Sequence, residues 1–208
     1  MLHAQTVEPK TLSVLRRVMR MKKLQKFYLV GGTALTLKYG HRISIDLGFF
    51  SNEKFDHSII INALEKEFSH QLAVESQTTK WGIFCFIENI KVDIVYYPHP
   101  IIKVPETIDN IRFYSAEDIL AMKINAILGR GKKKDFYDLD ELLNHFELND
   151  AIKFHQQKFP SQNLLITIPQ AISYFEDAEE SESPVSLKNQ TWESVKENIQ
   201  KEVRDFLS

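Results

Sequence analysis

Residues 28–35 read YLVGGTAL and residues 42–50 read RISIDLGFF, and these two stretches decide the fold. The first begins as a short apolar run that ends in two glycines, which predicts a buried strand running into a tight turn. Thr33–Tyr39 then predicts a short helix closed by Gly40, where helices often end in a left-handed residue. The second stretch predicts another strand, from Ile43 to Phe50.

The rest of the chain predicts a sheet followed by helices. Further strands are expected over 71–76, 82–88 and 91–97, the last two joined by a hairpin at Asn89. Helices are expected over 11–26, 56–68, 116–128, 134–146, 150–158, 162–175 and 191–207, with Thr11, Ser115 and Thr191 as N-caps. Residues 176–183 are acidic and serine-rich and predict a solvated loop. We therefore expect an α/β (α+β) protein whose small mixed sheet and flanking helices, with an N-terminal helix, fill residues 1–110. A helical portion over 111–208 should pack on a cleft.

Composition excludes several classes of protein. The 208 residues carry a formal net charge of −2, so only a local patch could attract nucleic acid. The basic residues of the predicted helix over 11–26 fit a solvated face or a contact with a phosphate backbone. The single cysteine, Cys85, excludes an intrachain disulfide and a cysteine-built zinc site. Without an apolar run of about 20 residues or a leader-like N-terminus, we expect a cytoplasmic protein with no membrane partner.

The glycine turn and two aspartates favour a phosphorylated ligand. The N–H groups of Gly31 and Gly32, at the start of a helix, would be open to phosphate oxygens, although such turns also occur for structural reasons alone. Asp46 and Asp93 lie in different apolar strands, where a lone carboxylate is costly without a partner. Carboxylates on neighbouring strands can hold Mg²⁺, which prefers oxygen ligands at about 2.0–2.1 Å. These residues together predict a magnesium and phosphate site.

Several ordered motifs resemble those of the DNA polymerase β-like nucleotidyltransferases, and specifically the AbiEii/AbiGii-type toxins of abortive-infection and toxin–antitoxin systems. The first two motifs are carried by Gly31, Gly32, Thr33, Arg42, Ser44, Asp46 and Asp93. Residues 119–126 (ILAMKINA), Arg130 and residues 134–139 (KDFYDL) are similar to the third and fourth motifs in type, order and approximate separation. Residues 173–179 and 191–193 resemble the tail of the family. The resemblance implies a polymerase β-like nucleotidyltransferase fold over most of the chain.

The resemblance also implies an activity and partners. Such a toxin would transfer a nucleoside monophosphate from a magnesium-bound nucleoside triphosphate to a hydroxyl, with a two-ion magnesium site. Relatives of this type modify the acceptor end of transfer RNA, so tRNA is a candidate acceptor, and a cognate antitoxin is a candidate partner. The rival interpretation is a non-catalytic module that binds nucleotide or an antitoxin.

Residue roles follow from the same resemblance. It implies catalytic roles for Asp46, Asp93, Lys123 and Asp135, with Asp46 and Asp93 as metal ligands. It implies nucleotide contacts for Gly31, Gly32, Thr33, Arg42, Ser44 and Lys123, the last reaching the triphosphate. Asp135 or Asp138 could act as a base toward the acceptor, orient Lys123 or Arg130, or simply begin a helix. Arg42 could equally be a structural ion-pair partner. The run Lys132–Lys134 fits an RNA contact or a charged loop, and His41 is assigned no metal.

Gly48 breaks the family pattern, which is Asp-x-Asp where this chain reads Asp46-Leu47-Gly48. Glycine supplies neither a ligand nor a charge, so we expect weaker metal binding and a loss of at least about two decades in rate. Gly48 could be an inactivating change, selected or engineered, in an active toxin. The chain could instead be a degenerate relative that still binds nucleotide, or another group such as Asp135, Glu53 or a water could complete the site.

Overall fold

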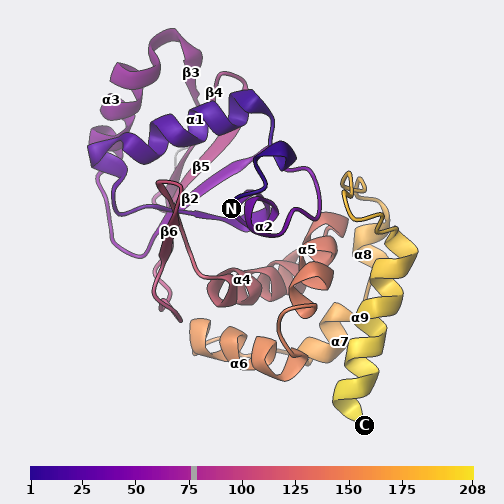
Figure 1. The fold of residues 1–208 in the computed structure, drawn as a ribbon. Coiled ribbons are helices and arrows are strands. Elements are labelled where there is room, and N and C mark those ends of the chain that lie inside the picture. The colour runs from indigo at the N-terminus through magenta and orange to yellow at the C-terminus, as the bar shows by residue number, and fades with distance from the viewer. Residues whose placement is uncertain (76–78) are drawn as a thin grey trace.

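The computed structural model describes residues 1–75 and 79–208, and it is a mixed α/β structure as predicted (Figure 1). Seven strands of the described residues form one sheet in the order β3-β4-β5-β2-β1-β7-β6. They are β1 (Tyr28–Val30), β2 (Leu47–Ser51), β3 (Leu72–Val74), β4 (Gly82–Ile87), β5 (Ile90–Tyr96), β6 (Glu106–Ile108) and β7 (Ile111–Phe113). The helices are α1 (Pro9–Arg20), α2 (Gly31–Tyr39), α3 (His57–Phe68), α4 (Ala116–Gly129), α5 (Lys133–Leu143), α6 (Leu148–Lys158), α7 (Ile168–Ile172), α8 (Glu176–Glu179) and α9 (Trp192–Leu207).

The centre of the sheet is formed by β1, β2 and β5. β2 pairs antiparallel with β1, and in this register Gly48 lies opposite Val30. On its other side β2 pairs parallel with β5, and there Gly48 lies opposite Asp93. β7 pairs parallel with β1, so residues 111–113 belong to the sheet and the helical part begins with α4.

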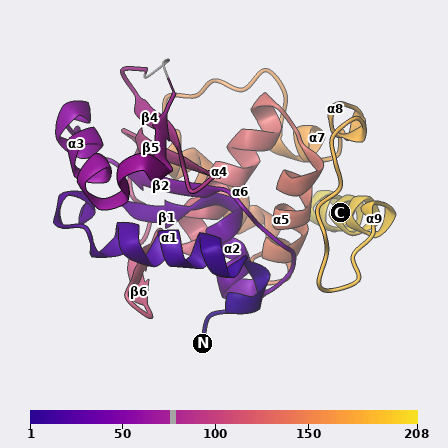
Figure 2. The ribbon, with the colours of Figure 1, turned by 90° about the horizontal axis from the view of Figure 1, so that it is seen from above.

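The two faces of the sheet have different surroundings. Alternate residues such as Phe49, Ile94 and Cys85 are fully buried in the core, on the face against which α1 and α3 pack. Figure 1 shows the sheet between α1 and α3 on one side and α4 and α6 on the other, and Figure 2 shows the same layers from above. The opposite face carries Gly48 and Asp93, because directly paired residues point to the same side of a sheet.

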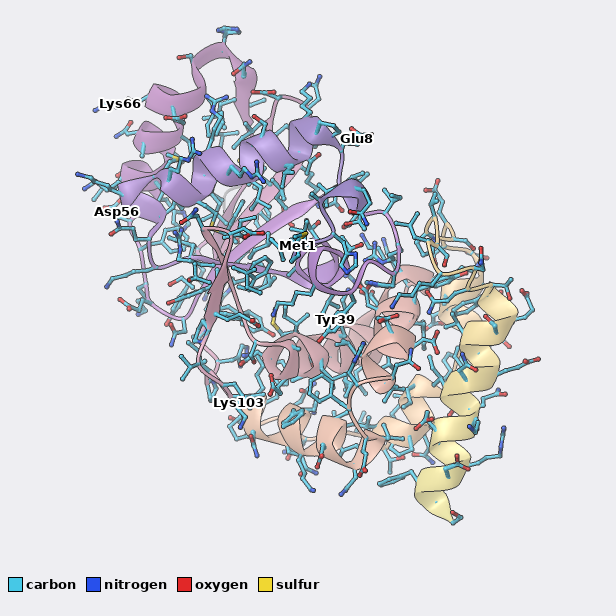
Figure 3. All side chains as sticks on the ribbon, viewed as in Figure 1. Met1, Glu8, Tyr39, Asp56, Lys66 and Lys103 are labelled. Carbon is cyan, nitrogen blue, oxygen red and sulfur yellow. The ribbon has the colours of Figure 1, made fainter. Side chains whose placement is uncertain are left out.

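The first helix differs from its prediction at both ends. α1 begins at Pro9 rather than at a Thr11 cap, because proline suits the first helical position, and Thr11 is buried. It ends at Arg20, and Lys22–Leu24 form a separate 3₁₀ turn. The guanidinium of Arg112 on β7 donates to the carbonyls of Met19 (2.8 Å), Leu24 (2.9 Å) and Phe27 (3.1 Å), which ends the helix and fixes its link to β1. Figure 3 labels Glu8 before α1 and Asp56, whose side chain caps α3.

The predicted strand over 43–50 is wrong in its first half. β2 begins at Leu47, so Asp46 precedes the strand and does not alternate within it. The backbone upstream is held by other partners, since Ile43 N–H donates to Val185 (2.9 Å) and Ser44 N–H donates to Thr6 (3.2 Å). Sequence periodicity contains no information about these distant partners. The strand predicted over 71–76 is observed as the shorter β3, from Leu72 to Val74. Ser76 lies outside the described residues.

The helical part is tied to the sheet by a buried ion pair. Nζ of Lys158 on α6 lies 2.6 Å from Oδ1 of Asp118 on α4, and both side chains are fully buried. Asp118 also accepts from the backbone of Ile102 and Lys103, so one carboxylate joins two helices and the segment after β5. Such a buried pair is costly to break from one side, by about 3–5 kcal/mol.

The caps of α4 and α9 are confirmed, but one long helix is not. Ser115 caps α4, and Thr191 caps α9. The predicted helix over 162–175 is wrong: only α7 forms there, because Thr167 and Gln170 make a capping box and Pro169 stands in the first turn. Within residues 1–75 and 79–208, no helix combines the length and apolar character that a membrane crossing requires.

Candidate functional site

A cleft of about 950 Å³ lies between the sheet and the helical part. Its lining includes nearly all the predicted site positions: Gly31, Gly32, Arg42, Ser44, Asp46, Gly48, Asp93, Lys123 and Asp135. Thr33 is fully buried and does not itself line the cleft. Its hydroxyl is hydrogen-bonded to the Ser44 hydroxyl (2.8 Å) and donates to the backbone carbonyl of Asp46. Since the Thr33 hydroxyl donates to that carbonyl, Ser44 donates to Thr33. The cleft is therefore assembled from segments that are far apart in the sequence.

The glycine turn, Gly31 and Gly32, forms the start of α2 and lines the cleft. Gly31 has a φ of +73°, which side-chain-bearing residues rarely adopt, and the helix begins at this residue. A Cβ on Gly32 would lie 2.0 Å from Nη2 of Arg42. The second glycine is thus required by close approach of the guanidinium. Gly40 closes α2 in the left-handed region, as predicted.

The two predicted metal ligands line the same cleft. Asp46 is half-exposed, and Lys134 Nζ lies 3.5 Å from its Oδ2. Asp93 is partly buried, and its Oδ1 has no hydrogen-bond partner among the described residues. Burial raises the pKa of Asp93; Lys91 lowers it, and the neighbouring charge of Asp46 raises it further. An unpartnered buried carboxylate oxygen beside a second carboxylate has the character of a cation ligand.

Gly48 lies between Asp93 of β5 and Val30 of β1. A Cβ there would meet Val30 Cγ2 at 3.3 Å and Phe50 Cε1 at 3.7 Å, so an aspartate would need only a small shift of a side chain. Within the described residues, no group of three or more His, Cys, Asp or Glu side chains is arranged to hold a metal ion. The site thus has two carboxylates, with room for a third at position 48.

A buried ionic cluster lies next to the cleft, and three of its members, Arg42, Lys123 and Asp135, line it. Asp138 accepts from Arg42 Nε (2.7 Å) and Nη2 (2.8 Å), and from His41 Nε2 (2.7 Å). Lys123 Nζ lies 2.5 Å from Asp138 and 2.8 Å from Asp135. Asp135 and Asp138 lie in the first two turns of α5, and both are fully buried. They are therefore partners in buried ion pairs and do not serve only to begin the helix.

The charges in this cluster stabilise one another. Burial alone would raise the pKa of Asp138, but Arg42 and Lys123 hold it well below its ordinary value. Burial likewise opposes the charged form of Lys123, and Asp138 and Asp135 together raise its pKa above the ordinary value. Asp135 has a lowered pKa because Lys123 and Arg130 outweigh the effect of its burial. Asp138, Asp135 and Lys123 are therefore ionised at neutral pH.

The acidic segment near the C-terminus is solvent-exposed at most of its positions, as its composition predicted, but it is not loop throughout. Residues 176–179 form α8, and Ser181–Val185 line the cleft. The strand-like contacts of Arg42 with Ser186 and the hydrogen bond from Ile43 to Val185 hold this segment against the residues before β2. Composition alone could not reveal that pairing.

Sequence reasoning also missed apolar and polar residues of the cleft wall. Phe50 and Tyr97 contribute rings whose centroids are 5.1 Å apart, and nothing in the sequence distinguished them from core residues. Asn125 of α4 lines the cleft with a buried Oδ1 that has no partner in the described chain. Asn125 lies within the motif that contains Lys123, which is the one signal that could have identified it.

Comparison with known proteins agrees with this architecture. The family described as "Nucleotidyl transferase AbiEii toxin, Type IV TA system" matches residues 13–207. An uncharacterized protein of Aquifex aeolicus (strain VF5) is 32% identical over 199 residues, which cover 93% of this chain and 94% of that protein.

Two solved structures share the fold. JHP933 from Helicobacter pylori has a TM-score of 0.59 at 19% identity, covering 98% of this chain and 92% of its own. MenT4, a nucleotidyltransferase toxin from Mycobacterium tuberculosis H37Rv, also has a TM-score of 0.59, at 14% identity, covering 93% and 83%. The predicted nucleotidyltransferase fold is confirmed, and the chain belongs to the AbiEii nucleotidyltransferase toxin family.

Proposed function

We propose that this chain binds a magnesium nucleoside triphosphate in the cleft and transfers its nucleoside monophosphate to a hydroxyl acceptor, at a rate limited by Gly48. The observation that supports this most is that Asp46 and Asp93 line one cleft together with the glycine turn of α2. The acceptor oxygen would bond to the α-phosphorus, and the bond from that phosphorus to the bridging oxygen would break. Pyrophosphate would leave with the electron pair, and the acceptor proton would pass to water.

The residues around α2 would bind and orient the triphosphate. The N–H groups of Gly31 and Gly32 lie at the positive end of the helix, where phosphate oxygens are favoured. Ser44 borders the same turn. Arg42 keeps its guanidinium against Gly32 through Asp138, so its main role is to fix the shape of the turn.

Lys123 would complete the phosphate end of the cleft. Its ammonium has three donors, and Asp135 and Asp138 occupy two directions, which leaves the third for an oxygen of the ligand. Because Asp135 has a lowered pKa, it is a weak base. We therefore assign it to positioning of Lys123 rather than to proton removal.

The carboxylates suit one magnesium ion better than two. Asp46 and Asp93, whose Oδ1 has no hydrogen-bond partner in residues 1–75 and 79–208, offer hard oxygen ligands, and Mg²⁺ is commonly held by one or two carboxylates together with substrate phosphates. The ion would neutralise charge that builds up on the phosphates. Gly48 leaves the two-ion arrangement one carboxylate short.

Other groups are poorly suited to replace that carboxylate. Asp135 is already paired with Lys123 and Arg130. Glu53 follows the far end of β2 and pairs with Lys26. We favour an impaired enzyme or a degenerate nucleotide-binding relative over a reconstituted site. The toxin role, a cognate antitoxin and tRNA as acceptor are further parts of the proposal, supported by family membership.

The decisive experiment compares the chain with Gly48→Asp and with Gly48→Asn, which has similar volume but no charge. Each would be incubated with radiolabelled nucleoside triphosphates, Mg²⁺ and total RNA. We expect labelling by Gly48→Asp to exceed that of the other two proteins by about 100-fold or more.

If all three proteins bind nucleotide but none labels RNA or protein, the non-catalytic module is the better function. The absence of a third carboxylate at position 48 is the observation that favours this alternative. If none is stabilised by nucleotide at all, the nucleotide site itself is wrong.

A further inference from the structure

The main cleft has a charged end and an aromatic end, and β2 and β5 connect them. Gly48 of β2 pairs with Asp93 of β5, and two residues further along β2 comes Phe50. Residues two apart point to the same side of a strand, so Phe50 lines the cleft about 7 Å beyond the level of Gly48. The glycine turn lies toward the other end, because β1 runs antiparallel to β2 and ends at Val30, opposite Gly48. A nucleotide with its phosphates at the turn would therefore extend toward Phe50.

Tyr97 completes the aromatic end of the cleft. It follows β5, and its N–H donates to the carbonyl of Ser51 at the end of β2 (2.7 Å). The centroid of its ring lies 5.1 Å from that of Phe50. Ile119 and Met122 of α4 add apolar side chains to the same lining. Nucleobases stack on aromatic rings of this kind, so the composition of this end suits the flat face of a base.

Asn125 is a polar residue of the cleft to which the proposed function gives no role. It lies three residues after Met122, so the two share one side of α4. Lys123 projects about 160° away from it around the helix, so Lys123 and Asn125 line the cleft from opposite sides of α4. Oδ1 of Asn125 is buried and has no hydrogen-bond partner within residues 1–75 and 79–208. A buried acceptor without a partner is unfavourable, and a ligand that donates to it would remove that cost.

The edge of a nucleobase supplies the donor that this amide lacks. Amide side chains pair with base edges that present a donor beside an acceptor. We propose that Phe50, Tyr97 and Met122 form a base subsite for the nucleoside triphosphate, and that Asn125 hydrogen-bonds the edge of the base and determines which base is preferred. This inference rests on the proposed function, since it concerns the substrate of the same cleft. A ribose hydroxyl is another donor on a nucleotide, so the test separates base from sugar.

The test measures the affinity of the full chain for ATP, CTP, GTP and UTP by calorimetry in Mg²⁺. Asn125→Ala should weaken binding of the preferred nucleotide by about 5- to 150-fold, the range for loss of a good amide–base pair, and bring the four affinities together. Asn125→Asp keeps the size of the side chain but accepts hydrogen bonds without donating them. Relative to UTP, it should favour the nucleotides whose bases carry an amino group. Phe50→Leu, which removes the ring, should weaken binding of all four by about fivefold or more.

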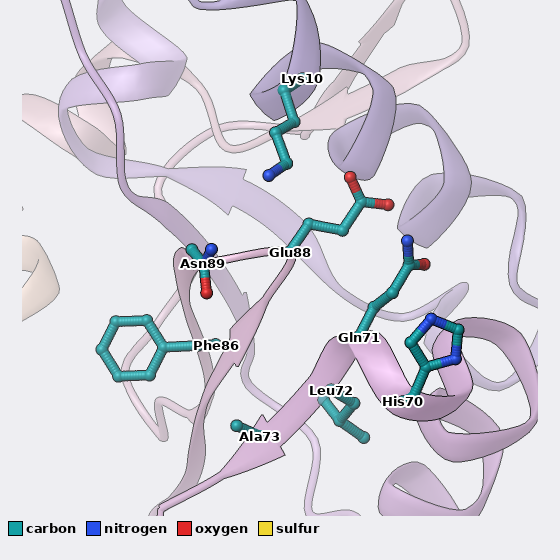
Figure 4. Close-up of a pocket in the computed structure, with 8 residues that line it drawn as sticks. All are labelled: Lys10, His70, Gln71, Leu72, Ala73, Phe86, Glu88 and Asn89. Atoms are coloured by element: carbon teal, nitrogen blue, oxygen red, sulfur yellow. The ribbon is translucent and has the colours of Figure 1, made fainter.

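The matched controls lie outside the cleft. Asn62→Ala changes an exposed asparagine of α3, which packs on the other face of the sheet. Phe86→Leu changes a phenylalanine that lines a separate hollow of about 340 Å³ (Figure 4). Both controls should bind the four nucleotides as the parent chain does. Thermal denaturation shows whether each variant is folded.

Three results would overturn the base subsite while Mg²⁺-dependent nucleotide binding still supports the proposed function. The parent chain could bind all four nucleotides equally, Asn125→Ala could keep their order and spread, or Asn125→Ala could abolish discrimination between ATP and 2′-deoxy-ATP but not between bases. The last result would assign the amide to the sugar. If no nucleotide binds, the proposed function and the base subsite fail together. If Asn125 variants change the base preference while Gly48→Asp labels no RNA or protein, nucleotidyl transfer fails and the base subsite stands.

Discussion

Gly48 and Asp93 lie directly opposite each other in the parallel pair of β2 and β5, on the face of the sheet that forms the cleft. A side chain at position 48 would therefore point to the same side of the sheet as the carboxylate of Asp93. The backbone of Gly48 does not need glycine: a Cβ would meet Val30 Cγ2 at 3.3 Å, and a side chain can yield at that distance. The glycine removes a charge without a visible structural benefit.

Gly48→Asp should make stability depend on magnesium. Without a divalent ion the new carboxylate is repelled by Asp93 and presses on Val30, which should cost about 1–3 kcal/mol. Mg²⁺ should recover much of this loss, because it binds the folded state. Thermal denaturation in EDTA and in Mg²⁺ measures the effect. Gly48→Asn, which cannot bear the charge, should respond little to Mg²⁺, and an equal response would contradict the assignment.

Gly32→Ala should be strongly destabilising, because the new Cβ would lie 2.0 Å from Arg42 Nη2 and would displace the guanidinium from Asp138. We expect a loss of about 3–5 kcal/mol in the free energy of unfolding, measured by urea denaturation. Gly129→Ala is the control: its Cβ would meet nothing within 4 Å at the end of α4, so it should be neutral or slightly stabilising. Similar effects of the two changes would refute the close-approach argument.

Asp138→Asn should remove the centre of the buried ionic cluster. It would leave Arg42 and Lys123 without their shared counter-charge, and a loss of about 3–5 kcal/mol is expected. The same substitution at Asp150, whose exposed pair with Lys153 is 2.9 Å long, should cost less than about 1 kcal/mol. Chemical denaturation of both variants distinguishes a buried from a superficial ion pair, and a small effect at Asp138 would contradict the cluster.

His155 should make the protein less stable in mild acid. Burial lowers its pKa to about 4 in the folded protein, against about 6.5 in the unfolded chain. Because the unfolded state takes up the proton first, stability should decrease as the pH falls from about 6.5 to about 4. His155→Phe, which keeps an aromatic ring beside Phe159, should flatten that part of the stability profile. An unchanged profile in the variant would show that other groups cause the acid sensitivity.

Local sequence signals predicted the elements that local chemistry determines. Glycine after an apolar run predicted the β1–α2 turn, and Ser115 and Thr191 predicted helix starts, because each signal acts within a few residues. The position of Asp46 was mispredicted, since Thr6 and Val185 hold the backbone before β2 from distant parts of the chain. The helix over 162–175 was mispredicted because apolar spacing hid the start signal at Thr167.

The candidate site was predictable in its residue types but not in its internal pairing. Nine of the positions chosen from the sequence line one cleft, although they come from five segments. The sequence left the partner of Arg42 and the role of Asp138 open, and the structure joins these two residues in a bidentate ion pair. Phe84 resembled an ordinary strand residue, because only the strand register shows that it lies opposite Asp93.

The most direct test of a magnesium nucleotide site at Asp46 and Asp93 is calorimetry of nucleoside triphosphate binding with and without Mg²⁺. The parent chain should bind nucleoside triphosphate more tightly with Mg²⁺ than without it. In Asp93→Asn, this increase in affinity should be smaller by at least about tenfold. Asp150→Asn, on the surface of α6, should behave like the parent chain. Binding by Asp93→Asn that retains the full response to Mg²⁺ would contradict the proposed site.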